Sequence, residues 1–266
     1  MADDKIRLGG MALQNGVLVH GPTAWAVAVR TDDGQLKVAS GRKRLRGADV
    51  RNPLLRGPTR MLDALLLLPR VRRARPEARL PFERPVVLGS LLASAAATRL
   101  LRGSGRLGPA AKEILSGGLS LLPATLALRG SNLAAYHGAE HISIGTYEHG
   151  EPRGKEHERC GSHLVGPMLA TSAVGAALSA KAPEELRGVA RVAAAVGALA
   201  AATELFSWMV RNPEHPIARA LARPGYELQR RFATADPDPD QLEVAEAALK
   251  ACLELEEHGA QHPNRG

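Results

Sequence analysis

The chain has 266 residues, of which 45% are hydrophobic and 23% are charged. This composition supplies enough apolar material for one sizeable core, or a core with a small satellite, and it excludes disorder along the whole chain. Aromatic residues make up only 3%, which excludes base-stacking platforms for single-stranded nucleic acid as a main feature. The apolar residues are mostly Ala, Leu and Val, and with abundant Arg they favour a mainly helical protein.

The N-terminal part of the chain, residues 8–45, has the pattern of short strands. Apolar and polar positions alternate, and Trp25-Ala26-Val27-Ala28-Val29-Arg30 is followed by Thr31-Asp32-Asp33-Gly34. Asp-Gly supplies the positive φ angles that a tight turn between two strands needs. The sequence therefore predicts a small antiparallel β element.

A basic connecting segment, residues 46–84, follows and carries much of the net charge of +8. Such a segment suits either nucleic acid phosphates or the cytoplasmic flank of a membrane segment. No nucleic-acid recognition motif accompanies the charge, so we expect no specific nucleic acid partner. With the helical part at the membrane, the basic residues 70–84 would face the cytoplasm. The excess of positive charge is concentrated at Arg70, Arg72, Arg73, Arg75, Arg79 and Arg84.

Residues 85–234 form the predicted helical domain. Its uncharged windows are 85–98, 114–128, 164–180 and 192–203. A membrane-spanning helix needs about 20 predominantly apolar residues, with a lower limit near 17, and only the third window comes close. Two interpretations stay open, namely buried helices of a soluble bundle and helices embedded in the cytoplasmic membrane with membrane lipid as the partner.

The last part, residues 235–266, is predicted to be an acidic linker and a helix. Asp236-Pro237-Asp238-Pro239-Asp240 is rich in turn formers, and Asp240 with Glu243 has the spacing of an N-cap and its reciprocal partner. A helix should follow to about Glu257. Both the N-terminal and the C-terminal parts are expected in the cytoplasm, since no secretory signal is visible at the start.

The two cysteines, Cys160 and Cys252, lie too far apart in sequence to form a disulfide framework, so a reducing compartment is expected. Cys252 recurs with Leu242, Ala245 and Leu249 at helical spacing, which predicts a core residue. His20 is expected at the surface.

The chemistry is expected where five of the nine histidines gather, between residues 137 and 163. The segment His137-Gly138-Ala139-Glu140-His141 is a His-x-x-Glu-His arrangement. On a helix, His137 and His141 stand one turn apart on the same face with Glu140 beside them. Two neutral imidazoles at this spacing can ligate one divalent ion, which leaves Glu140 free as a general base that takes a proton from water.

Further candidate ligands follow the motif. Glu148 comes seven residues after His141 and could be a ligand or a partner that orients an imidazole. His157 and Cys160 could close a tetrahedral site, and a nitrogen and sulfur donor set selects zinc over magnesium or calcium. A closed site would be structural and an open one catalytic. The alternative for the whole cluster is a solvated polar helix with incidental histidines.

Glu204 is the only charge in the long apolar stretch Ala200 to Val210. An isolated buried carboxylate is costly unless it is paired or binds a metal. Glu204 is therefore either a distal metal ligand or the partner of Arg187, Arg191 or Arg211, and the sequence does not separate the two.

Over most of its length the chain resembles the YqhQ family, a group of bacterial membrane proteins described as predicted metal-dependent enzymes. The resemblance implies a membrane location, several hydrophobic helices and a metal site, but no particular reaction. By matching positions it implies site roles for His137, Glu140, His141, Glu148, His157 and Cys160. The residues that carry the resemblance are Gly9-Gly10-Met11-Ala12, Gly16-Val17, Gly21-Pro22, Ala26 to Arg30, Leu55-Arg56-Gly57, Tyr136 to His141, Tyr147-Glu148, His157-x-Arg159-Cys160-Gly161, Glu204 and Asp240 to Ala245.

Together these patterns predict a mainly helical, membrane-associated bundle with a small N-terminal β element. The expected function is a zinc-dependent hydrolase with Glu140 as the base. If Glu204 is the third ligand and water the fourth, the site resembles that of inverted-motif metalloproteases, and by this analogy the first bond to test is the peptide bond. The alternative is a membrane-associated assembly or interaction protein with a structural zinc site.

Overall fold

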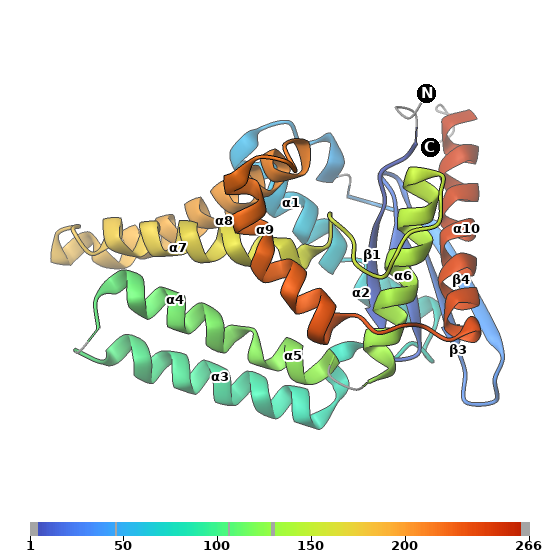
Figure 1. Ribbon diagram of the computed structural model, residues 1–266, viewed down its shortest axis with the longest axis horizontal. Helices are drawn as coiled ribbons and strands as arrows, with labels where there is room; N and C mark the ends of the chain where they lie inside the picture. The colour runs from blue at the N-terminus through green and yellow to red at the C-terminus, as the bar shows by residue number, and fades with distance from the viewer. Residues whose placement is uncertain (1–4, 46, 106, 129–130, 262–266) are drawn as a thin grey trace.

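The computed structural model describes residues 5–45, 47–105, 107–128 and 131–261. It is mainly helical with a four-stranded antiparallel sheet at the N-terminus, which confirms the predicted fold class at this level (Figure 1). In chain order the elements are β1 (Gly9–Leu13), β2 (Gly16–His20), β3 (Ala24–Arg30), β4 (Leu36–Arg42), α1 (Pro53–Leu65), α2 (Leu68–Ala74), α3 (Pro85–Gly103), α4 (Pro109–Ser120), α5 (Leu122–Leu128), α6 (Asn132–His149), α7 (Val165–Ser179), α8 (Arg187–Arg211), α9 (Pro216–Leu228) and α10 (Pro239–Gln261).

The sheet is a meander in the order β1-β2-β3-β4, so each strand pairs with its neighbour in sequence. The predicted hairpin is confirmed between β3 and β4, where Arg30 pairs with Leu36. Gly34 in the turn has a φ of 80°, a conformation that a residue without a Cβ adopts at little cost. The Asp-Gly signal thus located both strands and the turn.

Both faces of the sheet are buried, so the strands are more apolar than a strand with one wet face. Val17, Val19 and Ala26 belong to a core shared with α6 and α10. Leu18 and Val27 point the opposite way and belong to a second core shared with α2. The sheet is therefore the middle of three layers (Figure 1).

The C-terminal helix α10 packs against β2, β3 and β4, and beside it α6 packs against β1 and β2. The predicted core position of Cys252 is confirmed, since its side chain is fully buried. The cap lies two residues earlier than expected. Asp238 accepts a hydrogen bond from the backbone N–H of Gln241 at 2.8 Å, and Gln241 Oε1 accepts one from the N–H of Asp238 at 3.0 Å. Glu243 instead forms an ion pair with Arg30 at 2.5 Å.

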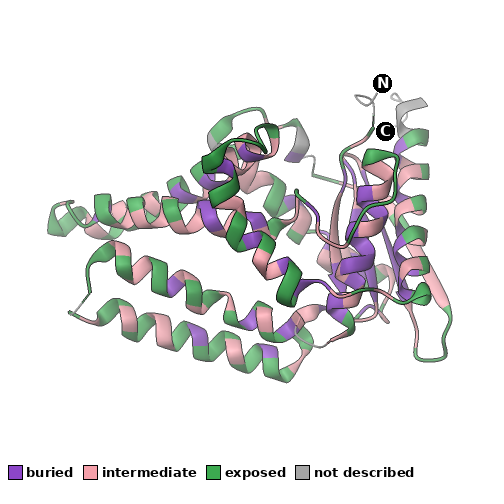
Figure 2. Cartoon of the chain, in the orientation of Figure 1, coloured by how far each residue is buried: buried purple, intermediate pink, exposed green. Residues whose placement is uncertain are grey.

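A second part of the molecule consists of long helices that extend away from the sheet (Figure 1). Helices α3 and α4 pack against each other, α4 packs against α7, and α7 packs against α8. Figure 2 shows that most of their surface is exposed or half-buried, in contrast to the sheet and the inner faces of α6 and α10. Much of this exposed surface is aliphatic, including Leu92 at 67%, Val189 at 70% and Val192 at 66% exposure.

Two helical segments, Pro85–Gly103 and Glu184–Arg211, are long and apolar enough to cross a membrane. Only 17% of the apolar window in each is buried, whereas the core helix of a soluble protein would be mostly buried. The sequence had favoured the uncharged window 164–180, which forms α7. Helices α3 and α8 are longer than α7, because they continue through arginines that had ended the uncharged windows. The lengths and compositions suggest a membrane association.

A buried polar network links α1 to the sheet. Lys43, directly after β4, forms an ion pair with Asp63 of α1 at 2.9 Å, and the two side chains are only 4% and 6% exposed. Lys43 also donates a hydrogen bond to Nδ1 of His20 at 3.1 Å. His20 was expected at the surface, but it belongs to this network. The sequence carried no signal for it because its partners lie 23 and 43 residues further along the chain.

Burial in the first place, and then the positive charge of Lys43, lower the pKa of His20 from 6.5 to about 4, although Asp63 and Glu256 act in the opposite direction. Folding favours the neutral form of His20. Its contribution to the free energy of unfolding is therefore fully present above pH 6.5 and is lost as the pH falls towards 4. When the pH is lowered from 8 to 5.5, His20 binds a proton in the unfolded chain but not in the folded protein. We expect this difference to lower the free energy of unfolding by about 1.4 kcal/mol. Denaturant unfolding of wild type and His20→Gln at both pH values measures the difference, and parallel pH dependences would contradict the expectation.

Candidate metal centre

Helix α6 carries the central part of the site. It starts after Ser131 and runs without interruption through Gly145 to His149, where Gly150 ends it with a φ of 75°. Gly138 lets the helix approach the chain near Ala235, whose carbonyl oxygen would lie 2.1 Å from a Cβ at this position. The helical register therefore places His137 and His141 one turn apart, as the spacing predicted, with ring centres 4.3 Å apart.

Both imidazoles are oriented by backbone carbonyl groups. Nδ1–H of His137 donates to the carbonyl oxygen of Ala233 at 2.8 Å, and Nδ1–H of His141 donates to that of Lys155 at 2.6 Å. A carbonyl oxygen can only accept, so the proton of each neutral ring is on Nδ1 and the lone pair is on Nε2. Burial lowers the pKa of His141, which favours the neutral ring. This is the arrangement that histidine ligands of metals have in proteins.

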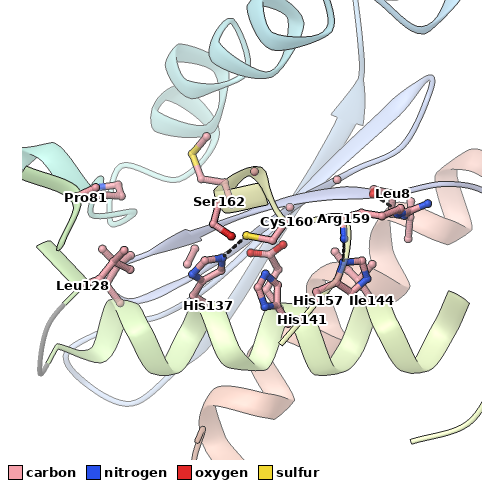
Figure 3. A pocket seen from close by; sticks show the side chains of 18 of the residues that line it. Leu8, Pro81, Leu128, His137, His141, Ile144, His157, Arg159, Cys160 and Ser162 are labelled. Atoms are coloured by element: carbon pink, nitrogen blue, oxygen red, sulfur yellow. Dashed lines mark hydrogen bonds between the residues drawn. The ribbon is translucent and has the colours of Figure 1, made fainter. Parts of the chain in front are cut away.

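Cys160 reaches the same place from a turn after α6. The turn is fixed by Gln229, which is fully buried and accepts a hydrogen bond from the backbone N–H of His157 at 2.8 Å. Gln229 also donates to Oγ of Ser162 at 2.8 Å. Cys160 lies between these two contact points, and its Sγ is 3.6 Å from Nε2 of His137 (Figure 3).

Ligand atoms of His137, His141 and Cys160 all lie within 4.8 Å of one another. Zinc bonds of about 2.0–2.1 Å to nitrogen and about 2.3 Å to sulfur place tetrahedral ligands roughly 3.3–3.6 Å apart. The distance between Cys160 Sγ and His137 Nε2 already has this value. Two imidazole nitrogens and a thiol are donors that suit zinc, so the residues present fit such an ion.

Glu140 points from α6 towards strand β1. Its side chain is buried, and burial raises the pKa of its carboxyl group, although the nearby His137 and His157 act in the opposite direction. The carboxylate lies directly over Gly10, because a Cβ at that position would be 2.2 Å from Oε1 of Glu140. The absence of a side chain at Gly10 therefore makes the space that Glu140 occupies.

Glu148 and His157 are close to each other but form a separate group. Nδ1 of His157 accepts a hydrogen bond from the backbone N–H of Arg159 at 3.1 Å, so its proton is on Nε2, which lies 3.3 Å from Oε2 of Glu148. Glu148 also forms an ion pair with Arg159. The structure thus places Glu148 beside His157 and Arg159, but Nε2 of His157 is buried and makes no hydrogen bond.

Glu204 is not brought to this cluster. It lies on α8 and forms a two-pronged ion pair with Arg56 of α1. The sequence offered Arg187, Arg191 and Arg211 as partners because they are near in sequence. The actual partner comes from a helix almost 150 residues earlier, which packs along α8.

A cavity of about 430 Å³ adjoins the cluster. His137, Glu140, His141 and Cys160 line one side of it, together with His157 and Arg159. The other walls are mainly apolar and come from β1 and the residue before it, α5, the chain before α3 and other positions of α6 (Figure 3). They consist of Leu8, Met11, Ala12, Pro81, Ala124, Ala127, Leu128, Leu133 and Ile144.

Two residues that complete the site were not singled out from the sequence for this role. Gly10 was named only among the residues that carry the resemblance to the YqhQ family, and Gln229 received no role. Both act through contacts with segments more than 70 residues away in sequence, which leave no periodic or motif signal. For Gly10 the only available indication was its place in the glycine-rich segment of the family resemblance.

Comparison with known proteins gives one finding. Residues 131–255 match the model of a family described as a protein of unknown function (DUF1385). No curated protein and no solved structure matches the chain. The match begins just before α6 and ends within α10, and it contains all the candidate site residues named from the sequence. The resemblance to the YqhQ family stays a prediction. Slightly less than half of the chain is therefore similar to an uncharacterised family, and that part carries the candidate metal centre.

Proposed function

We propose that this protein is a zinc-dependent, membrane-associated hydrolase. The observation that carries the proposal is the orientation of His137 and His141, whose Nδ1–H groups are held by carbonyl oxygens so that both Nε2 atoms are free beside Cys160 Sγ. Three protein ligands with one remaining position are typical of catalytic zinc sites, whereas structural sites use four. Among the residues that the structure describes, the compact donor group has three members.

The cavity supports a catalytic interpretation of this centre. Its polar side is formed by the three ligands and Glu140, so a substrate in the cavity would meet them. When bound, zinc would supply a Lewis acid that activates water. Glu140 is the proposed general base, because its carboxylate is buried next to the ligands and burial raises its pKa, which makes it a stronger proton acceptor than an exposed carboxylate.

The peptide-bond prediction depended on Glu204 as the third ligand, and Glu204 is paired with Arg56. The apolar walls of the cavity favour a substrate with an apolar group of moderate size.

Elemental mass spectrometry of detergent-purified protein tests the metal centre. We expect near-stoichiometric zinc in wild type and in Glu140→Gln, and loss of zinc in the double variant His137→Ala, His141→Ala. His149→Ala is the matched control, since His149 lies on the same helix but is half-exposed and pairs with Glu158. Absence of metal from wild type under non-chelating conditions would reject the zinc proposal.

A hydrolysis screen on amides and esters with apolar acyl groups tests the role of Glu140. A general base contributes typically 10²–10⁴-fold, so Glu140→Gln should keep zinc and lose activity by about 10²-fold or more. Loss of zinc from Glu140→Gln would make the carboxylate a ligand and support the alternative, a structural zinc site in an assembly protein. Full activity in Glu140→Gln would reject the proposed base.

A further inference from the structure

Helix α1 is amphipathic, but its apolar face points outward. Leu55, Met61, Leu62 and Leu65 fall on one side of the helix, and they are 53%, 44%, 52% and 50% exposed. Leu66, directly after the helix, extends the same surface and is 40% exposed. A helix on the surface of a soluble protein has the opposite orientation, with its apolar stripe towards the core.

The polar face of α1 points inward and is held by specific contacts. Asp63 forms the buried ion pair with Lys43 of the sheet, and Arg56 pairs with Glu204 of α8. Between them, Gly57 lies so close to α8 that a Cβ there would be 2.0 Å from Oγ1 of Thr203. Three independent contacts therefore fix the rotation of α1 about its axis, and rotation that buried the leucines would break all of them.

An outward apolar face of this size needs an apolar environment, and its position indicates which one. The helix packs along the last turns of the segment Glu184–Arg211, one of the two segments able to cross a membrane. It therefore lies where that segment approaches the sheet. Arg60 on the helix and Arg73 on the following helix α2 are exposed. Exposed arginines in the same segment as an apolar face suit the anionic headgroups at a membrane surface.

We infer that α1 is an interfacial helix whose outward face, formed by Leu55, Met61, Leu62 and Leu65, lies in the boundary between headgroups and acyl chains of the membrane. This inference rests on the membrane association proposed above and adds a contact surface outside the two candidate spans. The ion pairs Asp63–Lys43 and Arg56–Glu204 then connect a lipid-contacting helix to the sheet and to α8. The segment that the sequence described only as basic thus contains a lipid-facing element.

Photo-crosslinking in vesicles tests the inference with the full chain. A benzophenone amino acid replaces Leu62 on the outward face of α1, Leu92 on the exposed surface of α3, or Asp33 in the exposed turn between β3 and β4. Each protein is reconstituted in vesicles of phosphatidylcholine and phosphatidylglycerol at 3:1 and irradiated. Intact-protein mass spectrometry then measures the phospholipid adduct. Leu65 serves as a second outward position if the change at Leu62 prevents folding.

We expect adducts at Leu62 and Leu92 at no less than tenfold the yield at Asp33. Adduct at Leu92 without adduct at Leu62 or Leu65 would overturn the inference for α1 and leave the membrane association intact. Absence of adduct at Leu92 as well would overturn both. Equal adduct at all three positions would show unspecific contact and would also reject an interfacial role for α1.

Discussion

Replacing Lys43 with methionine is expected to lower the free energy of unfolding by about 3–5 kcal/mol, because the change leaves the carboxylate of Asp63 buried without its partner. Both side chains are almost completely buried, and their N–O distance is 2.9 Å. The loss can be measured by denaturant unfolding in detergent. The double change Lys43→Met, Asp63→Leu should recover most of it, since two apolar side chains of similar size can replace a buried ion pair.

Lys37→Met is the matched control for this prediction. Lys37 lies on β4 and pairs with Glu77 at the same distance of 2.9 Å, but these side chains are 37% and 36% exposed. Exposed ion pairs contribute about 0–1 kcal/mol, so the control should change stability little. An equal loss in both variants, or a loss below about 1 kcal/mol for Lys43→Met, would show that burial does not set the strength of the Lys43–Asp63 pair.

The second large effect is expected from Gly10→Ala. The new methyl group would lie 2.2 Å from Oε1 and 2.4 Å from Cδ of Glu140, so the carboxylate or the strand must move. Overpacking of this kind costs about 1–3 kcal/mol. If Glu140 is the general base, a displacement of about 1 Å could also reduce hydrolysis by roughly 10²-fold. Zinc content should stay near stoichiometric, because the three atoms nearest to the new methyl group all belong to Glu140, which is not one of the proposed ligands.

Gly161→Ala provides the comparison, since Gly161 follows Cys160 directly but a Cβ there would have no atom within 4 Å. This variant should match wild type in unfolding free energy and in zinc content. Unchanged stability and activity in Gly10→Ala would mean that Glu140 can move without consequence, and that its position over Gly10 is not needed.

The elements that depend on neighbouring residues could be predicted from the sequence. The turn at Gly34, the helix that buries Cys252 and the common face of His137 and His141 all follow from local spacing and conformational preference. The approach of Cys160 to His137 was one of several open combinations. Which of His157, Cys160, Glu148 and Glu204 joins the two histidines depends on how the turn after α6 folds back, and no local pattern encodes that.

The contacts that the sequence could not predict join distant segments. Gly10 with Glu140, Gln229 with His157, and Arg56 with Glu204 are each set by how helices and strands pack. The outward face of α1 belongs to the same class. Its periodicity is visible in the sequence, but the direction of its apolar side is decided by the partners of Arg56 and Asp63.

The arrangement of the sheet also sets an order of events during synthesis on the ribosome. The strands end at Arg42, but α10, which covers one of their faces, begins at Pro239. At about 5–20 residues per second, the intervening chain of about 200 residues takes about 10–40 s to make. The apolar helices emerge during this interval, so they can enter a bilayer before the sheet is covered. A nascent chain that stops before α10 would leave Val17, Val19 and Ala26 without their cover, so this core of the sheet is complete only after α10 has been made.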